Sequence, residues 1–415
     1  MSIADFAWVL LIALICLLSV QTSRYFFGHW FSPLSIYICG NAGSLGLYHL
    51  RWLDLIPLSL ATYCLALASM TLFALGALLA VGWRPMQLGE AASRPVDRRG
   101  LATFFYITAV LANAGWLLAA AILTLRFGIA GVLANLWLLQ NEFQLQFIGY
   151  LNLTGILVAP AYVIKRAFAS RRPLDHVLLG LALIGLILAG IKSYVTISVI
   201  AAGLAWSVSQ PRRFRGRHLA FVLCGLLAFF VIYTRHIDVF VHKEYAGSEV
   251  SSKVPWLHRP YLYTVGSWPA LETLLRGDVA PPPRFGHVIL EPLWKILAGL
   301  QIVPAYPRPL PFTNIGADMF NVYSFVGEIY WDVGLWPALL LSWLLGFAVT
   351  RLYYRARSCH YWGHRLIYAV FGYGVFLSLF QCAYSFNMLY LLTYTYLLGF
   401  VAVRGGVLVK RADHA

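Results

Sequence analysis

Charged residues are scarce in this 415-residue chain, and acidic residues are scarcer than basic ones. Asp, Glu, Lys and Arg make up 11% of the sequence, against about a quarter in an average soluble domain. Such a chain has too little charge to cover the surface of an ordinary water-soluble fold. It has instead 60% hydrophobic residues and a mean hydropathy of +0.72. This composition predicts an all-α polytopic integral membrane protein.

Sequence patterns for metal and nucleophilic chemistry are missing as well. There is no Asp-x-Asp, no His-Glu-x-x-His and no Gly-x-Ser-x-Gly, and the histidines expected on the outer side are scattered. We therefore expect neither a metal nor a cofactor. Of the six cysteines, five lie in apolar stretches and Cys359 lies in a basic loop, so no disulfide framework is expected.

Long apolar stretches make up much of the chain. Stretches suited to crossing about 30 Å of hydrocarbon as helices recur along the chain. We predict about eleven spans, at residues 6–23, 31–50, 56–83, 101–125, 145–164, 174–191, 195–209, 219–234, 333–350, 366–383 and 389–403. Residues 1–23 lack the basic segment and the small-residue cleavage site of a signal peptide, so we expect the first span to stay in place.

Basic residues fall in alternate connections between these stretches. Those connections hold 20 of the 31 Lys and Arg residues but only four acids, namely Glu90, Asp97, Asp175 and Asp413. Positive connections face the cytoplasm, which places the N-terminus outside and the C-terminus inside. The outer side then has a net charge of −1, so the total of +15 indicates topology and not a nucleic-acid partner.

One polar region interrupts the apolar pattern on the outer side. Residues 235–328 contain 11 of the 19 prolines, which excludes long helices and central strands there. Two short amphipathic helices, 267–275 and 287–300, are expected to lie in the plane of the membrane interface. The predicted organisation is residues 1–234 with eight spans, 235–328 as a large periplasmic loop, and 329–415 with three spans and a tail.

Cations on the outer side are candidate substrate-binding groups. Arg and Lys there run against the preference that sets the topology, and a guanidinium binds phosphate oxygens through two parallel hydrogen bonds. Aromatic residues of the same region suit the apolar faces of sugar rings. The candidates are Arg259, Arg276, Arg284, Lys192 and Arg126. The alternative, that each is an ordinary solvated loop charge, stays open.

Two of these cations have unusual surroundings in the sequence. Lys192 lies in a turn between two short spans, at headgroup depth, where an ionisable group is costly and contact with lipid phosphates is the alternative role. Arg126 begins the outer segment 126–144, which is too short to cross the membrane and return. For that segment, re-entrant and interfacial placements both stay open.

Acidic residues gather at the start of a late span. Glu328 and Asp332 are four residues apart and share a face if Asn321 caps a helix that continues into the span. The pair would then lie deeper than the first turn, and the field of one carboxylate would raise the pKa of the other, as suits a general base. Simple polarity at the start of a helix is the alternative. Behind these two stand Glu272, Glu291, Asp318 and His287.

The spacing around this acidic pair resembles a motif of bacterial oligosaccharide repeat-unit polymerases, the Wzy-type O-antigen and exopolysaccharide polymerases. The pattern is Asn-x-Tyr, about eight residues, then Asp-x-Gly at the head of a late span. Here these positions are Asn321, Tyr323, Asp332 and Gly334. Gly286, followed by an amphipathic helix, is similar to another element of the family's outer loop. One departure is that no outer arginine here is followed by glycine eleven residues later, as in some members.

The resemblance implies a membrane glycosyltransferase with its active site at the periplasmic face of the bacterial inner membrane. Such enzymes transfer a glycan from undecaprenyl diphosphate to a sugar hydroxyl of the next lipid-linked repeat unit. The resemblance also implies a chain-length regulator and a flippase as partners. Cations would neutralise the diphosphate, Asp332 or Glu328 would accept the hydroxyl proton, and Asn321 and Tyr323 would position the glycan. An O-antigen ligase acting on lipid A core and a lipid-linked glycan transporter stay open as alternatives.

Overall fold

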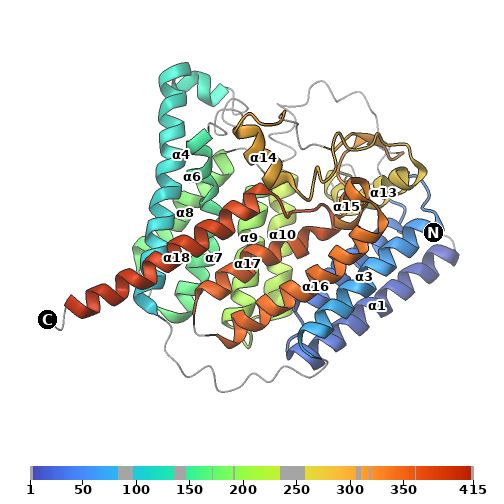
Figure 1. Ribbon diagram of the computed structural model, residues 1–415, viewed down its shortest axis with the longest axis horizontal. Coiled ribbons are helices and arrows are strands. Elements are labelled where there is room, and N and C mark those ends of the chain that lie inside the picture. Colours follow the sequence, from blue (N-terminus) through green and yellow to red (C-terminus); the bar gives the residue numbers. More distant parts are fainter. Residues whose placement is uncertain are drawn as a thin grey trace. The chain divides into compact units, whose positions relative to one another are not determined.

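The computed structural model describes most of the chain, and Figure 1 draws these segments as coloured ribbons. The described residues are 3–82, 97–134, 146–170, 172–189, 192–233, 258–304, 310–316, 319–359 and 361–412. Helices dominate them. Strands in these ranges are limited to β1 (Thr313–Asn314) and β2 (Met319–Phe320), an antiparallel pair in which Thr313 faces Phe320. The prediction of a largely helical chain is therefore confirmed.

Each predicted apolar stretch overlaps one or two helices. The long and middle-sized helices are α1 (Ile3–Phe27), α2 (Pro33–Tyr48), α3 (Leu60–Ala80), α4 (Arg98–Ala134), α6 (Gln146–Leu153), α7 (Gly155–Phe168), α8 (Pro173–Leu188), α9 (Lys192–Ser209), α10 (Gly216–Tyr233), α16 (Leu335–Ser358), α17 (Gly363–Phe376) and α18 (Phe386–Ala412). Among the described residues, five segments are long and apolar enough to cross a membrane: Asp5–Phe27, Leu60–Ala80, Arg98–Gly131, Ile148–Phe168 and Leu335–Ser358. The count of eleven spans stays a prediction.

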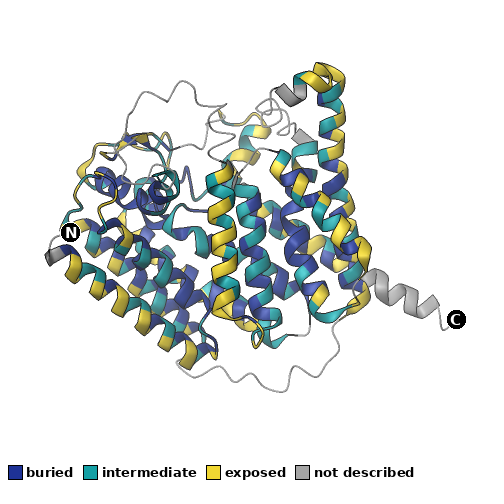
Figure 2. Cartoon of the chain, turned by 180° about the vertical axis from the view of Figure 1, so that it is seen from behind, coloured by how far each residue is buried: buried dark blue, intermediate teal, exposed yellow. Residues whose placement is uncertain are grey.

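Apolar side chains remain exposed along these helices. In α1 the exposed residues include Leu10, Leu14, Leu17 and Tyr25, and Figure 2 shows exposed stripes running along helices beside buried ones. Water-soluble monomers rarely expose contiguous apolar faces of this kind. A hydrocarbon environment would cover these side chains, in agreement with a membrane protein.

Short helices occupy the polar region between α10 and α16. They are α12 (His258–Val265), α13 (Ser267–Arg276), α14 (Glu291–Gly299) and α15 (Phe325–Val333). The helix predicted at 267–275 is confirmed as α13. The helix predicted at 287–300 is shorter, because residues 285–290 form turns that begin at Gly286 with its left-handed φ of 69°.

The predicted helix cap at Asn321 is wrong. Ser324 caps α15 instead, and its Oγ accepts a hydrogen bond from Gly327 N at 3.3 Å. Glu328 therefore lies in the first turn, where the positive end of the helix dipole favours a carboxylate. Gly334, with a left-handed φ of 89°, then separates α15 from α16, so the acidic pair lies on a short helix of its own.

The segment at Arg126 is also clearer than the sequence indicated. The helix α4 runs past Arg126 to Ala134 and changes direction at Gly128, which has a φ of 70°. Residues 135–145 lie outside the described part of the chain, and so does the choice between re-entrant and interfacial placement.

Two compact units make up the chain. Unit 1 comprises Met1–Gln87, Glu244–Tyr354 and Gly374–Leu389, and unit 2 comprises Leu88–Lys243, Arg355–Tyr373 and Tyr390–Ala415. The division into residues 1–234, 235–328 and 329–415 stays a prediction.

Small and polar residues hold the helices of unit 1 together. A Cβ on Gly76 of α3 would overlap the Trp343 carbonyl of α16, so the two backbones approach closely there. Next to this crossing, Tyr37 Oη lies 2.7 Å from Ser69 Oγ, which lies 3.0 Å from Ser342 Oγ. The chain of hydroxyls links α2, α3 and α16 at buried positions.

A buried ion pair plays the equivalent role in unit 2. The Lys165 ammonium of α7 contacts the Asp175 carboxylate of α8, and both side chains are almost fully buried. Tyr106 of α4 donates a hydrogen bond to Asp175 Oδ1 at 2.9 Å. Removing Lys165 or Asp175 would leave the other buried charge unpaired, and the Tyr106 bond adds α4 to the network that fixes the ends of the three helices relative to one another.

Candidate functional site

The short helix α13 carries two of the predicted site residues, Glu272 and Arg276. Pro269 lies near its start, where a missing N–H costs little, and Leu271 and Leu274 are buried against the rest of unit 1. The helix ends at Gly277, whose φ of 79° is the left-handed conformation of a helix C-terminus. Glu272 is only 2% exposed, so α13 brings a carboxylate into the protein interior.

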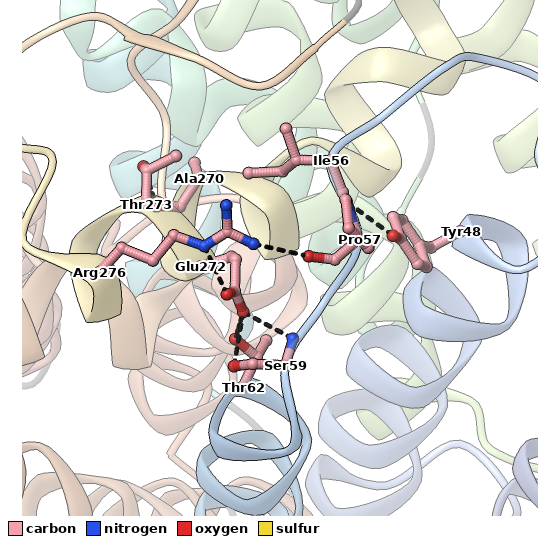
Figure 3. A network of polar contacts seen from close by, with 9 residues as sticks. All are labelled: Tyr48, Ile56, Pro57, Ser59, Thr62, Ala270, Glu272, Thr273 and Arg276. Carbon is pink, nitrogen blue, oxygen red and sulfur yellow. Dashed lines mark hydrogen bonds and ion pairs between the residues drawn. The ribbon is translucent and has the colours of Figure 1, made fainter.

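The Glu272 carboxylate lies at the N-terminus of α3 (Figure 3). Its Oε2 accepts hydrogen bonds from Ser59 N at 2.8 Å, Ser59 Oγ at 2.8 Å and Thr62 Oγ1 at 2.6 Å. Its Oε1 accepts a bond from Arg276 Nε at 2.8 Å. Ser59 is the cap residue of α3 but makes no capping bond with its own side chain. Glu272 therefore supplies the negative charge that a helix N-terminus favours.

These bonds also decide the protonation of Glu272. Burial alone would raise its pKa, but the hydrogen bonds from Thr62, Ser59 and Arg276 outweigh burial and lower the pKa to about 2. Both carboxylate oxygens are already occupied, and so weak a base is poorly suited to accept a proton from a sugar hydroxyl. The geometry favours a structural role, in which Glu272 fastens α13 to α3.

Arg276 differs from its partner because it reaches the surface. Its side chain is 45% exposed, while Nε bonds to Glu272 and Nη2 donates to Pro57 O at 3.2 Å. Figure 3 shows the two protein contacts that orient this guanidinium, which is also partly exposed. An accessible, oriented guanidinium is well suited to phosphate oxygens.

Asp332 on α15 is a buried carboxylate of a second kind. Its Oδ2 accepts hydrogen bonds from the backbone N–H groups of Val288 at 3.0 Å and Ile289 at 2.9 Å. Its Oδ1 is buried and has no hydrogen-bond partner in the part of the chain that the structure describes. One oxygen of Asp332 therefore holds the turn before α14, and the other has unused acceptor capacity.

The turn held by Asp332 also carries two predicted site residues, Arg284 and His287. The Arg284 guanidinium lies 4.7 Å from the centre of the Trp294 ring, and Trp294 Nε1 donates to Gly286 O at 3.0 Å. The buried His287 ring meets the Trp331 ring edge-on, with centroids 5.9 Å apart. We call Arg284, His287, Trp294, Trp331 and Asp332 the turn cluster. It unites the segments that the family resemblance singles out.

Glu328 and Tyr323 lie inside the protein near the start of α15. Glu328 is 2% exposed, and Tyr323 is fully buried with its hydroxyl donating to Pro311 O at 2.9 Å. Burial and the charge of Glu328 both raise the pKa of Tyr323, so its hydroxyl stays protonated. Asn321 is half-buried. Tyr323 therefore has a structural partner, and its contact with a glycan stays a prediction.

The remaining predicted residues are spread over the chain. Glu291 pairs with Lys295 at 2.9 Å, and Arg259 is a half-buried residue of α12. Asp318 lies outside the described residues. Arg126 is exposed on α4 and Lys192 is the first residue of α9; both belong to unit 2 and are described apart from the turn cluster.

Sequence reasoning missed a polar cluster at the ends of α1 to α3. His49 Nδ1 lies 2.9 Å from Asp5 Oδ1, and its Nε2 lies 3.1 Å from the Tyr63 hydroxyl. Arg51, with an unusual φ of 53°, places its Nε 3.7 Å from the same Asp5 oxygen. The cluster was hidden because His49 ends an apolar stretch and Asp5 lies 44 residues away. The only signal was that both ends were expected on the outer side.

No group of three or more His, Cys, Asp or Glu residues that could hold a metal occurs within the described ranges. The pair His360 and His364 has metal-ligand spacing, but His360 lies outside them. Comparison with family models, with curated proteins and with solved structures finds no match to this chain. The likeness to Wzy-type polymerases therefore depends on motif spacing and architecture.

Proposed function

We propose that this chain is a membrane glycosyltransferase that polymerises undecaprenyl-diphosphate-linked oligosaccharide repeat units at the periplasmic face of a bacterial inner membrane. The observation that carries the proposal is the turn cluster. There, a buried Asp332 oxygen without a partner belongs to the same set of contacts as the Arg284 guanidinium. The helices suited to crossing a membrane fit a substrate that is itself anchored in lipid.

Asp332 is the preferred general base in this proposal. Its Oδ1 would accept the proton of the acceptor hydroxyl. At the same time, the hydroxyl oxygen would form a bond to the anomeric carbon of the donor glycan. The bond from that carbon to the diphosphate oxygen breaks, and the lipid diphosphate leaves with the electron pair. Glu328 is the second candidate for the base, and His287 stands behind it.

Guanidinium groups would stabilise the departing diphosphate. Arg276 and Arg284 are the best placed of the described cations, since each is oriented by protein contacts and is at least partly accessible. Arg259, Lys192 and Arg126 stay as further candidates, with Asn321 and Tyr323 for the glycan. Lipid diphosphate is a good leaving group, so charge neutralisation and proton removal are the main demands on the protein.

The substitution Asp332→Asn tests the proposal with little change of structure. An amide oxygen can still accept the bonds from Val288 N and Ile289 N, whereas the amide cannot serve as a base. In a strain whose own gene for this chain is deleted, we expect the variant to reach wild-type abundance and to leave only single repeat units on a polymer gel. The matched control is Asp278→Asn, an exposed acid just after α13, which should give normal ladders.

Three other results would change the conclusion. Normal ladders with Asp332→Asn and also with Glu328→Gln would remove the turn cluster from the mechanism. Transfer of glycan to lipid A core without chain growth would identify a ligase. Unpolymerised repeat units that stay on the cytoplasmic side in the deletion strain would identify a transporter.

A further inference from the structure

A second site, independent of the proposed function, is indicated by Arg365 in unit 2. This arginine is only 8% exposed, and its Nε and Nη1 are buried without a hydrogen-bond partner in the described part of the chain. Its guanidinium lies 4.4 Å from the centre of the Phe168 ring. Buried charged groups are almost always paired, because an unpaired one loses its hydration without compensation.

The hydrogen-bond donors of this guanidinium lie along its edge, which is therefore the place where an anion would bind. Phe168 covers one face of the guanidinium. Its ring attracts the cation but accepts none of the N–H hydrogen bonds. The donors point outward in the guanidinium plane, where they match two oxygens of a phosphate or carboxylate. A partner for Arg365 should therefore be an anion with at least two acceptor oxygens.

The surroundings favour an anion as well. Arg365 lies in the first turn of α17, which contains no acidic residue, although a helix N-terminus disfavours a cation. Burial and the charges of Arg355 and Arg365 lower the pKa of His364, so the local field is positive. Trp362, three residues before Arg365, also has a buried Nε1 donor without a partner among the described residues.

We propose that the edge of Arg365 binds the phosphate of an anionic phospholipid headgroup. The apolar helix α16 ends with Arg355 and Arg357, and α17 begins only a few residues later. Headgroup phosphates lie at this depth, where an apolar span gives way to basic residues. Free phosphate has the same chemistry and is distinguished by experiment.

The test measures retained lipid on the purified full-length protein by native mass spectrometry. Micelles contain phosphatidylglycerol or phosphatidylcholine at equal mole fraction, and a third arm contains inorganic phosphate alone. We expect wild-type protein to retain phosphatidylglycerol preferentially and Arg365→Met to bind it at least about tenfold more weakly, since charge-assisted bonds are lost. Arg217→Met removes the same charge from an exposed position of unit 2 and should stay within about twofold of wild type.

Thermal unfolding in the same micelles gives a second readout. Without anionic lipid, Arg365→Met should be as stable as wild type or more stable, because it removes an unpaired buried charge. With phosphatidylglycerol, only wild type and Arg217→Met should gain stability. If inorganic phosphate alone stabilises wild type equally, the site takes free phosphate. Equal lipid retention by wild type, Arg365→Met and the conservative Arg365→Lys would overturn the proposal.

Discussion

Glu272 on α13 and Asp332 on α15 are both buried carboxylates of unit 1, yet their oxygens are used differently. Glu272 accepts four hydrogen bonds, from Ser59, Thr62 and Arg276, and neither oxygen is left over. Asp332 accepts two bonds on one oxygen and keeps the other bare. Burial alone therefore does not mark a catalytic acid. In the proposed mechanism, the number of unused acceptor positions separates Glu272, which holds the fold, from Asp332, which would act as the base.

The same comparison explains why each acid is tolerated. Glu272 is compensated by the N-terminus of α3 and by a guanidinium, so its charge stabilises the folded state. Asp332 has only two backbone N–H groups as partners in the described part of the chain. An incompletely satisfied buried group is a cost that proteins retain where function requires it.

Matched amide substitutions give the sharpest test of this difference and the largest expected effect. In Glu272→Gln, the amide must turn its N–H₂ group towards Arg276 or towards the donors of Ser59 and Thr62. The substitution also leaves the Arg276 guanidinium without a charged partner. We expect a loss of about 3–5 kcal/mol in unfolding free energy. Asp332→Asn keeps both backbone bonds, so we expect a loss of about 1 kcal/mol or less.

Denaturant unfolding of both variants in detergent micelles measures these losses side by side. Asp278→Asn is the control for a charge change at an exposed position on the same segment. Similar losses of unfolding free energy at Glu272 and Asp332 would show that both acids stabilise the fold equally. The proposed difference between their roles would then be wrong.

The helices were predictable from the sequence, and their interruptions were only partly so. Apolar runs located each long helix because a span must bury its backbone polar groups in helical hydrogen bonds. The separation of α15 from α16 was missed, although Gly334 followed by Pro337 is a local signal for one helix ending and another beginning. The capping role of Ser324 was hidden by Asn321, an equally good cap residue three positions earlier.

Acid pH should weaken the Glu272 anchor specifically. The folded-state pKa is about 2, below the ordinary value of 4.5, so the stabilisation is complete above pH 4.5 and is lost as pH falls towards 2. The difference corresponds to about 3 kcal/mol, and part of it is screened because Arg276 is half exposed. Unfolding of wild type and Glu272→Gln should therefore be measured between pH 5 and pH 2.

The expected result is that the stability gap between these two proteins narrows steadily over that range. Glu272→Gln lacks the titrating carboxyl group, so the effects of acid on the rest of the protein cancel when the two stabilities are subtracted. A gap that stays constant with pH would mean that Glu272 is not the titrating group.

The hydrogen-bond partners of Glu272 and Asp332 could not be predicted from the sequence. Ser59 and Glu272 are 213 residues apart, and Asp332 meets backbone groups 43 and 44 residues earlier, where side-chain identity carries no information. The sequence-based preference for Asp332 over Glu272 came from its position at the head of a span and from the Asp-x-Gly motif, and it stays a prediction. Recognising that Glu272 is saturated required the fold, since single-sequence patterns do not report long-range hydrogen bonds.

Arg276 gives the smallest and most selective effect. Arg276→Met removes one of the four bonds to Glu272 but keeps the three bonds from α3, and its own side chain is half exposed. We expect a loss of only about 1 kcal/mol, which shrinks further at high salt as a surface ion pair does. If Arg276 also binds a diphosphate, as proposed, chain growth should fall by at least tenfold despite normal protein abundance, as about 1.4 kcal/mol of lost binding already would cause. An effect on stability without an effect on polymer length would assign Arg276 to the anchor alone and leave Arg284 as the main guanidinium of the site.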